Sequence, residues 1–516
     1  MTNIPLQSIT FPDLPDNIYD IPRTAENIAY NETAIYSEGT VGKSIQNLSR
    51  GQHLYGARWD RVTNNLERLY DAEDFPTNTD NFCHKGTFNQ NIDNPFDQLY
   101  PWKDMVVCDV DLVKYRSGNY ALEDCIKAFY GDPNFTYFGD ENTFVGRYRP
   151  EFWYKSEEDS SGRVTYMVST VGRIGFKHAP ASIAGISFCV DVGNSKVSSG
   201  AGVPLANIAC STIHSRAKSS GFTLVDINDL DADIVLFLVE YANMNAQNAI
   251  GDGCSNCYRE NAADAITAVD NSGEKTTITV DDASFSGVAY VGADVHIGAT
   301  VGAVTYKAII EAVSVSGTAY TINLDRKLES VEVGMYASVH GFATCEFPYI
   351  GQSVGNGSGY IGTAGKANAF YRGRVLFANL YNYILGIYRQ TSSNRIWLCP
   401  DNLNPDDFDA LDTSKHYDTG VSLPDVAGSW LTVGGNAQRI SGLAGFMATG
   451  ESSGSSTSPV GDQQYVPVKT AGNTILFAGG NASHGWPCGV FSGHWHSAAG
   501  SSYWPFAASP LLKNPQ

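Results

Sequence analysis

Residues 479–512 are GGNASHGWPCGVFSGHWHSAAGSSYWPFAASPLL. In this stretch, apolar or tight-turn residues alternate with small, polar or ring-bearing residues, which predicts a core interleaved with an exposed face. Trp504 and Phe506 would bury enough apolar area to fix the backbone and leave their neighbours facing solvent. The apolar and tight-turn set is Gly485, Cys488, Gly489, Val490, Phe491, Trp495, Trp504 and Phe506.

The composition is that of a folded acidic protein. The chain has 516 residues, a formal net charge of -20, 17% charged residues, 12% aromatic residues and 51 Gly. Its length predicts about three structural units, and its composition predicts turns and aromatic packing rather than disorder. Because an acidic surface repels phosphate, we expect no nucleic-acid partner and no anionic membrane partner.

The chain has neither a membrane span nor a disulfide framework in its pattern. The longest strongly apolar run, Ile234 to Val239, is far shorter than the ~20 residues that a span needs, and the amino terminus lacks a signal peptide. We therefore expect a soluble protein without membrane insertion. Ten scattered cysteines predict mostly reduced, buried thiols.

The first half of the chain divides into a polar arm and a mixed region. Residues 1–54 are predicted to form an extended N-terminal arm that docks on a partner or a sister subunit. Within 55–263, YGARWDRVTNNLERLYDAED predicts a strand, a turn and a polar helix, and FVGRYRPEFWYK and RVTYMVST predict strands around the turn DSSG. DINDLDADIVLFLVEYANM predicts a buried helix that begins at Asp226 or Asn228.

Residues 264–344 differ sharply in composition from their surroundings. Short alternating runs rich in Val, Thr and Ile, separated by Gly and Ser-Gly turns, predict a small all-β module. The aromatic, loop-rich character resumes over 345–516, so we interpret the module as an insertion within a host domain. In that second part, FYRGRVLFANLYNYILGIYRQ predicts an amphipathic segment, and RIWLCPDNLNPDDFDALD predicts a strand and an acidic loop.

Two motifs in the sequence match catalytic patterns only in part. SEGTVGKS, residues 37–44, ends like a phosphate-binding loop but has Ser37 where the first Gly is required and no apolar strand before it. Gly450, Ser452 and Gly454 fit G-x-S-x-G, yet they lie in a Ser and Gly tract rather than between a strand and a helix. We predict neither an NTP site nor an esterase.

Possible metal ligands are also incomplete, and we predict no metal and no cofactor. Cys254 and Cys257 lack a partner pair for zinc, although Cys257 and Cys345 flank the module and would lie close together as a disulfide or as packed thiols. An acidic loop offers carboxylates for Ca²⁺ but misses the EF-hand spacing, which favours a solvated loop. Its residues are Asp401, Asp406, Asp407, Asp409 and Asp412.

Four stretches resemble the variable proteins of diversity-generating retroelements, which include phage receptor-binding proteins. They are YGARWD at 55–60, FLVEYAN at 237–243, FYRGRVLFANLYNYILGIYR at 370–389 and the GGN…CGVF…AAGSSYWPF ending. The third looks like the family's arginine-glycine element followed by its N-L-W-G-N type helix, with Tyr381 and Tyr383 near positions where the family often has Trp. The resemblance implies an α+β fold, a C-type-lectin-like domain similar to that of formylglycine-generating enzymes.

The resemblance also implies which residues vary. In the family, mutagenesis at adenines turns asparagine codons into NNY codons, which never encode Trp, Lys, Glu, Gln or Met. The residues thereby implied to vary and to bind ligand, together with the fixed anchor Trp486, are Ala482, Ser483, His484, Pro487, Ser492, Gly493, His494, His496, Ser502, Tyr503 and Pro505. The implied scaffold residues are Cys488, Gly489, Phe491, Trp495, Trp504 and Phe506.

The function that the resemblance implies is non-enzymatic. We expect a phage tail-fibre or receptor-binding protein that binds a bacterial surface protein or glycan, forms a homotrimer and contacts other virion proteins through its arm. It would be made in the bacterial cytoplasm and act in the virion. Two alternatives remain open: a structural virion protein without a receptor role, and a formylglycine-generating-type oxidase, for which Cys345, Cys399 and Cys488 supply no recognisable copper-binding pair.

Overall fold

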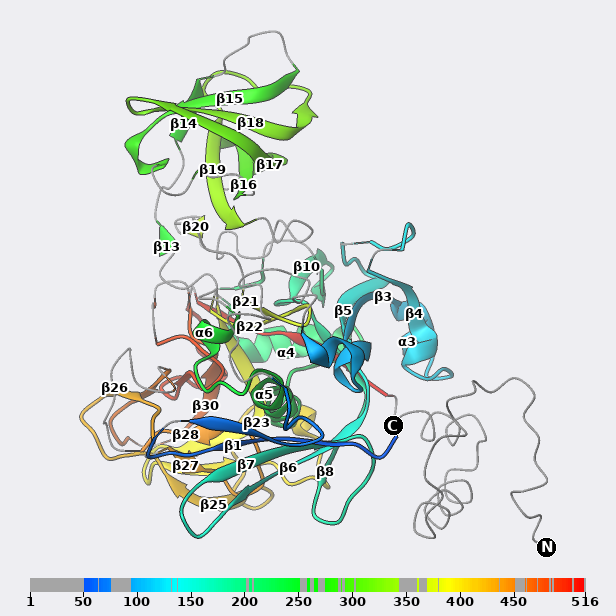
Figure 1. Cartoon of the computed structure of the whole chain (residues 1–516), viewed down its shortest axis with the longest axis vertical. Helices are drawn as coiled ribbons and strands as arrows, with labels where there is room; N and C mark the ends of the chain where they lie inside the picture. The colour runs from blue at the N-terminus through cyan, green and yellow to red at the C-terminus, as the bar shows by residue number, and fades with distance from the viewer. Residues whose placement is uncertain are drawn as a thin grey trace, which may run out of the picture.

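The protein is built mainly from β-sheet, with few helices (Figure 1). The computed structural model describes residues 51–514 apart from 64, 76–93, 131, 137, 201–203, 207, 251–257, 260–263, 268–273, 286–288, 290–292, 301–302, 343–359, 362–368, 379, 436, 451–459, 461, 471, 482–483, 485–486 and 504. The predicted arm therefore lies outside the described residues except for positions 51–54.

The first sheet is five-stranded and antiparallel, in the order β2-β1-β7-β6-β8. The polar helix predicted around LERLY is wrong: this segment is β2, which pairs residue for residue with β1 from Tyr55↔Tyr70 to Trp59↔Leu66. Tertiary pairing overrides the helical preference of its Leu, Glu and Arg side chains. The strands are β1 Leu54–Trp59, β2 Leu66–Tyr70, β6 Phe152–Glu158, β7 Val164–Ser169 and β8 Lys177–Ala179.

The second sheet joins the last strand of the described chain to strands from its first half. Its order is β12-β33-β9-β5-β3-β4, and β33, the last strand, lies between β12 and β9. Short helices flank it: α3 Leu112–Arg116 and α4 Cys210–Ser219. The strands are β3 Val106–Asp111, β4 Ile126–Phe129, β5 Thr143–Arg149, β9 Ser182–Gly185, β12 Thr223–Leu224 and β33 Pro510–Lys513.

The third sheet is eight-stranded and carries the C-terminal segment. Its path is β25-β24-β23-β30-β31-β29-β26, and β32 adds to β23 in parallel. The strands are β23 Tyr381–Gln390, β24 Arg395–Leu398, β25 Tyr417–Ser422, β26 Ser429–Thr432, β29 Gln463–Val466, β30 Asn473–Ala478, β31 Gly493–His494 and β32 Phe506–Ala507.

Strand β23 corrects a second expectation, because the resemblance implied a helix in this segment. Its side chains alternate between two cores: Tyr381 and Tyr383 pack into one, and Ile384 and Ile387 into the other. Burial on both faces removes the polar alternation that marks a half-exposed strand. At Gly386, whose φ is +79°, the strand bulges, and the register with β30 shifts between Ile384 and Tyr388.

Helix α5, Ile227–Tyr241, lies between the first and third sheets and contacts β1, β7 and β23 (Figure 1). Of the two predicted caps, Asp226 is the one that caps it, by accepting hydrogen bonds from the N–H groups of Asn228 and Asp229. Every residue of the helix except Asn228 is buried. The predicted buried helix is therefore confirmed, and it forms the centre of the largest core.

Buried ion pairs join the helix to the segment 369–377. Asp233 of α5 accepts from Arg147 at 2.9 Å and from Arg374 at 2.6 Å, and Glu240 accepts from Arg372 at 2.6 Å. These groups are almost fully buried, so removing one partner would leave an uncompensated charge in the core. Both arginines of the sequence YRGR therefore position β21 Ala369–Tyr371 and β22 Arg374–Phe377 against the helix.

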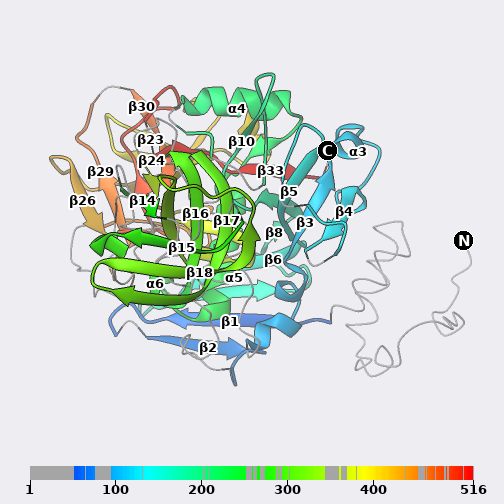
Figure 2. The ribbon, with the colours of Figure 1, turned by 90° about the horizontal axis from the view of Figure 1, so that it is seen from above.

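The predicted all-β stretch contains a closed six-stranded barrel in the order β14-β15-β18-β17-β16-β19. It stands apart from the three sheets, and the paired short strands β13 and β20 lie between (Figure 1). Figure 2 views the molecule from the barrel side, so that the barrel strands lie in front of the sheets. Closure leaves no free sheet edge. The strands are β13 Tyr258–Arg259, β14 Asp264–Thr267, β15 Lys275–Asp281, β16 Ala293–Thr300, β17 Ala303–Ser316, β18 Ala319–Leu328, β19 Tyr336–Phe342 and β20 Tyr360–Ile361.

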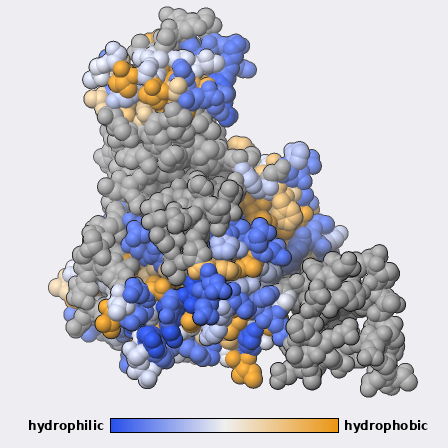
Figure 3. Space-filling model, viewed as in Figure 1, coloured by the Kyte–Doolittle hydropathy of each residue, from blue (hydrophilic) through white to orange (hydrophobic). Residues whose placement is uncertain are grey.

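Figure 3 shows that the face turned to the viewer in Figure 1 is largely hydrophilic over the lower body, with scattered hydrophobic spots.

The remaining elements are short. The remaining elements are β10 Val190–Gly193, β11 Lys196–Ser198, α6 Ala246–Ile250, β27 Gln438–Arg439 and β28 Met447–Ala448, and the 3-10 turns Pro95–Gln98, Trp102–Asp104, Glu123–Cys125, Ala283–Phe285 and Pro405–Asp407.

Candidate functional site

The C-terminal segment enters the third sheet through the two-residue strand β31. Gly493 and His494 pair with Gln464 and Tyr465 of β29 on one side and with β30 on the other. The backbone of Trp495, directly after β31, is also held by hydrogen bonds. The N–H of Trp495 donates to the carbonyl of Tyr465 at 3.2 Å, and the Trp495 carbonyl accepts from Thr474 Oγ1 at 2.7 Å.

The buried side-chain amide of Gln464, on the neighbouring strand β29, connects the loops around β31 through hydrogen bonds. Gln464 is fully buried; its Nε2 donates to the carbonyls of Met447 and Phe491 at 2.8 and 2.9 Å. Its Oε1 accepts from the N–H of Thr449 at 3.1 Å and from Nε1 of Trp495 at 3.2 Å. All of its hydrogen-bonding capacity is therefore used within the protein, which fixes the position of the Trp495 ring.

Gly489 and Asp462 form a second tight contact. A Cβ at Gly489 would overlap the Asp462 carboxyl group, and Asp462 Oδ2 accepts from the N–H of Phe491 at 2.7 Å. Burial raises the pKa of Asp462 well above its usual range. Because Gly489 has no side chain, the backbone at this position can pass close to the Asp462 carboxyl group.

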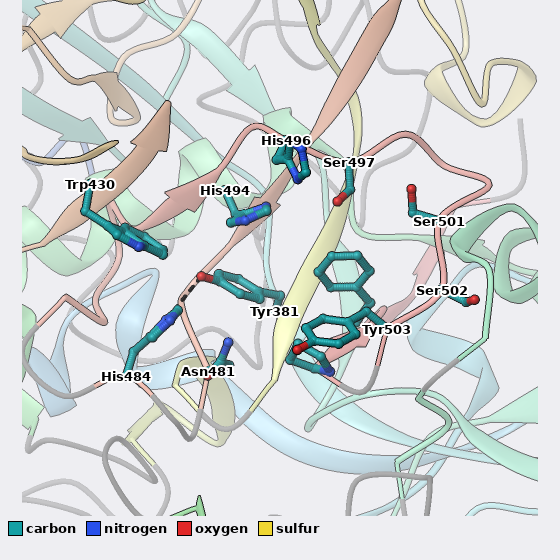
Figure 4. Close-up of a pocket in the computed structure, with 12 residues that line it drawn as sticks. Tyr381, Trp430, Asn481, His484, His494, His496, Ser497, Ser501, Ser502 and Tyr503 are labelled. Atoms are coloured by element: carbon teal, nitrogen blue, oxygen red, sulfur yellow. Dashed lines mark hydrogen bonds between the residues drawn. The ribbon is translucent and has the colours of Figure 1, made fainter. Parts of the chain in front are cut away.

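A cavity of about 410 Å³ opens in front of this framework (Figure 4). Six of the residues that line it are ones that the family resemblance implies to vary, and the others come from β23, β26 and the C-terminal segment. The first group is His484, His494, His496, Ser502, Tyr503 and Pro505; the second is Tyr381, Trp430, Asn481, Ser497, Ser501 and Phe506.

Aromatic rings form one wall of the cavity. Figure 4 shows Tyr381 in the middle of the site, with Trp430, His484 and His494 on one side and the three serines on the other. The Tyr381 hydroxyl lies 3.1 Å from Nδ1 of His484, whose ring meets Trp430 edge-on with centroids 4.8 Å apart. The ring of His494 lies between those of Tyr381 and Tyr465, at centroid distances of 5.4 and 5.0 Å.

The wall is electrically neutral at pH 7. Burial, together with the neighbouring His496 and His484, lowers the pKa of His494 to about 3. Burial also lowers the pKa of His484 and raises that of Tyr381 well above its usual value. Among the described residues that line the cavity, none is Asp, Glu, Lys or Arg. The site therefore offers aromatic faces and neutral hydrogen-bonding groups.

The structure divides the residues implied to vary into exposed and buried groups. His496, Ser502 and Tyr503 are exposed, whereas His494, His484 and Pro487 are half-buried. Ser492, Gly493 and Pro505 are buried, contrary to the expectation that they face solvent. Gly493 belongs to β31, which is paired on both sides, and Ser492 immediately precedes it. Ala482, Ser483 and Trp486 lie outside the described residues.

Most of the implied scaffold residues lie in the cores. Cys488, Phe491 and Trp495 belong to the core around helix α5, and Phe506 belongs to the core on the other face of β23. Gly489 is buried against Asp462, and Trp504 lies outside the described residues.

Sequence reasoning missed five cavity residues. Tyr381 was noted only as a substitute for Trp in the family pattern, and Trp430, Asn481, Ser497 and Ser501 were not singled out. Asn481 adjoins the implied variable positions, which was a usable signal. No feature of the sequence pointed to Trp430, because this residue comes from β26, a strand that is joined to the site only by sheet pairing.

Two carboxylates of the acidic loop, which was considered as a Ca²⁺ site, are hydrogen-bonded to a histidine. Asp406 Oδ1 and Asp409 Oδ1 lie 2.6 and 2.5 Å from the two ring nitrogens of His214, which is buried on α4. Burial by itself would lower the pKa of His214, but these hydrogen bonds outweigh it and raise the pKa to about 9. The protonated ring of His214 therefore holds the acidic loop against helix α4 through its hydrogen bonds to the two carboxylates.

The other motifs carry no site in the described part of the chain. Residues 37–44, Ser452, Gly454, Cys254, Cys257 and Cys345 lie outside the described residues, and the six cysteines within them are buried thiols. Among the described residues, no three His, Cys, Asp or Glu side chains gather as metal ligands would. In the same part of the chain, no helix is long and apolar enough to cross a membrane.

Comparison with known proteins yields no relative: neither a protein-family model nor a curated protein sequence matches this chain.

Proposed function

We propose that this chain is a phage receptor-binding protein that recognises a bacterial surface ligand through the cavity formed by its C-terminal segment. In this proposal the domain is lectin-like, a retroelement diversifies the rim of the cavity, and the protein acts as a homotrimer on the virion. The N-terminal arm attaches it to other virion proteins.

One observation carries the proposal. Six residues that the family resemblance implies to vary line one cavity with the aromatic wall of Tyr381 and Trp430, while the described apolar residues between them are buried in the cores. Binding energy at interfaces is concentrated in a few aromatic anchors, and Tyr is suited to this because it has few rotatable bonds. Tyr503, with 57% of its surface exposed, is such an anchor.

The test is binding of the full-length protein to cells of the bacterial strain that carries the gene. Replacing His494, His496 and Tyr503 together with Ala should abolish cell binding and leave the melting temperature nearly unchanged. A matched variant, His178→Ala with Tyr120→Ala, removes exposed rings far from the cavity and should bind as the wild type does. Cell binding that survives the triple replacement would overturn the proposal.

A second measurement tests the diversification separately. Sequencing the DNA beside the gene should reveal a near-copy of its 3′ end, with asparagine codons at the implied variable positions, next to a reverse-transcriptase gene. A flanking region without such a copy would refute retroelement diversification and leave receptor binding to be judged by the cell assay.

A further inference from the structure

We propose that the cavity binds an uncharged saccharide, stacked on the rings of Trp430 and Tyr381 and hydrogen-bonded by the serine and imidazole rim. This inference rests on the receptor-binding function proposed above and names the chemical class of its ligand. Three properties of the cavity lead to it: its size, its charge and the way its polar and aromatic groups are arranged.

The size of the cavity fits a small ligand. Its volume is about 410 Å³, whereas pockets for small molecules span about 300–1,000 Å³. A stable protein–protein interface buries about 800 Å² of each partner and usually has an apolar centre. Of the described cavity residues, Tyr503 is the one large hydrophobic side chain that is exposed. The site is therefore a pocket of the size that suits a small molecule.

The charge of the cavity disfavours an ionic ligand. Its described lining has no carboxylate, ammonium or guanidinium group, and the half-buried His484 and His494, whose pKa values are lowered by burial, are neutral at pH 7. An anion placed here would lose its hydration without gaining an opposite charge, and the chain as a whole carries a net charge of -20. A quaternary ammonium would be attracted to the aromatic faces but would leave the polar rim unused.

The arrangement of groups matches the two-sided chemistry of a sugar ring. A pyranose has C–H groups on its faces, which the negative face of an aromatic ring attracts, and hydroxyl groups around its edge. Trp430 supplies a ring on one side of the cavity and Tyr381 one in its middle, and Ser497, Ser501 and Ser502 lie on the other side (Figure 4). Serine hydroxyls both donate and accept hydrogen bonds, as sugar hydroxyls do.

A buried nitrogen points to the same conclusion. Nδ1 of His494 is shielded from solvent and makes no hydrogen bond with the described protein. A buried polar atom without a hydrogen-bond partner destabilises the folded protein. Because the ring lines the cavity, a bound hydroxyl group is a means of satisfying this atom after a small rotation of the imidazole.

The cavity thus combines two groups of residues with different roles. Trp430 and Tyr381 lie outside the residues implied to vary and supply the stacking surface, while His494, His496 and Ser502 lie among them. Diversification of the rim would then change which neutral sugar is preferred, and the wall would keep the ligand within one chemical class.

The test uses the full-length protein and a panel of immobilised glycans that contains neutral hexosides and N-acetylhexosaminides beside uronic and sialic acid glycosides. We expect retention on neutral members only. Trp430→Ala should weaken that binding by about tenfold or more, the effect of losing a binding hot spot. The matched control is Trp153→Ala. Like Trp430, Trp153 is half-buried and contacts a histidine ring: it stacks on His178 with ring centroids 5.0 Å apart, but it lies in the first sheet.

Treated cells separate this inference from the function on which it rests. Periodate, which cleaves sugar diols, should abolish binding of the wild-type protein to host cells, and protease treatment of the cells should leave it intact. Binding that is lost after protease but not periodate, with the His494, His496 and Tyr503 variant still inactive, would leave receptor binding standing and overturn the saccharide. Retention on acidic glycans alone, or on none of the panel, would overturn it as well.

Discussion

The imidazole of His494 lies nearly parallel to the phenol of Tyr465, with ring centroids 5.0 Å apart and 14° between their planes. The two residues are direct partners in the parallel pairing of β31 with β29. The position of the imidazole is therefore set by strand register, through backbone groups that every residue except proline provides. A substitution at His494 changes the wall of the cavity while the hydrogen bonds of the sheet remain.

Two serines implied to vary should respond differently to the same enlargement. Ser492→Tyr places a phenol ring where the side chain is fully buried, so we expect the free energy of unfolding to fall by about 1–3 kcal/mol or more from overpacking. Ser502→Tyr adds the same ring at an exposed position and should change stability by no more than about 0.5 kcal/mol. Urea denaturation of both variants measures the difference, and equal losses would contradict the assignment of Ser502 to the tolerant rim.

Gln464→Leu should be among the most destabilising single substitutions in the third sheet. It preserves the approximate size of the side chain but leaves two carbonyls, one N–H and the Trp495 indole N–H without their partner. Each buried unpaired group costs about 1–3 kcal/mol, so a total loss above about 3 kcal/mol is expected in denaturant titration.

The neighbouring Gln463 provides the control for this substitution. It is half-buried on the same strand and makes one long side-chain hydrogen bond, 3.3 Å to Thr432 Oγ1. Gln463→Leu should therefore cost less than about 1 kcal/mol. Similar losses at both positions would mean that strand propensity, not the buried network, decides the effect.

The sequence predicted the elements whose signals are local. Helix α5 was found because a capping residue precedes a continuous apolar stretch, and the strands β6 and β7 were found because aromatic residues flank a tight turn. The barrel strands follow the Val, Thr and Ile alternation. In each case the pattern lies within the element itself and needs no knowledge of its neighbours.

The failures concern elements defined by distant partners. LERLY has helix-favouring side chains and becomes a strand because β1 offers a complete register. The segment after Leu380 lacks a polar face because it is buried between two cores, so its period of two was hidden. The cavity likewise needed Trp430, whose place beside His484 depends on sheet order rather than on sequence spacing.

Gly489→Ala should destabilise the C-terminal segment for a steric reason. The added methyl group would overlap the buried Asp462 carboxyl group, which also accepts the Phe491 N–H and so cannot move away freely. We expect a loss of more than about 1 kcal/mol, typical of forced overpacking. In an Asp462→Ala background the additional cost of Gly489→Ala should shrink, because the obstacle is gone. Additive effects in this double-mutant cycle would contradict the contact.

His214 should stabilise the protein in a pH-dependent way. Its pKa is raised to about 9 between Asp406 and Asp409, against about 6.5 for an unperturbed histidine in the unfolded chain. Between these values the folded protein keeps a proton that the unfolded chain has released, so this contribution is full below about pH 6.5 and is lost as the pH rises through about 9. The difference in free energy of unfolding between wild type and His214→Gln should accordingly shrink from pH 6 to pH 10 in denaturant titrations, and Asp409→Asn should weaken that trend by removing one carboxylate. A difference that stays constant over this range would show that His214 acts through packing and not through its charge.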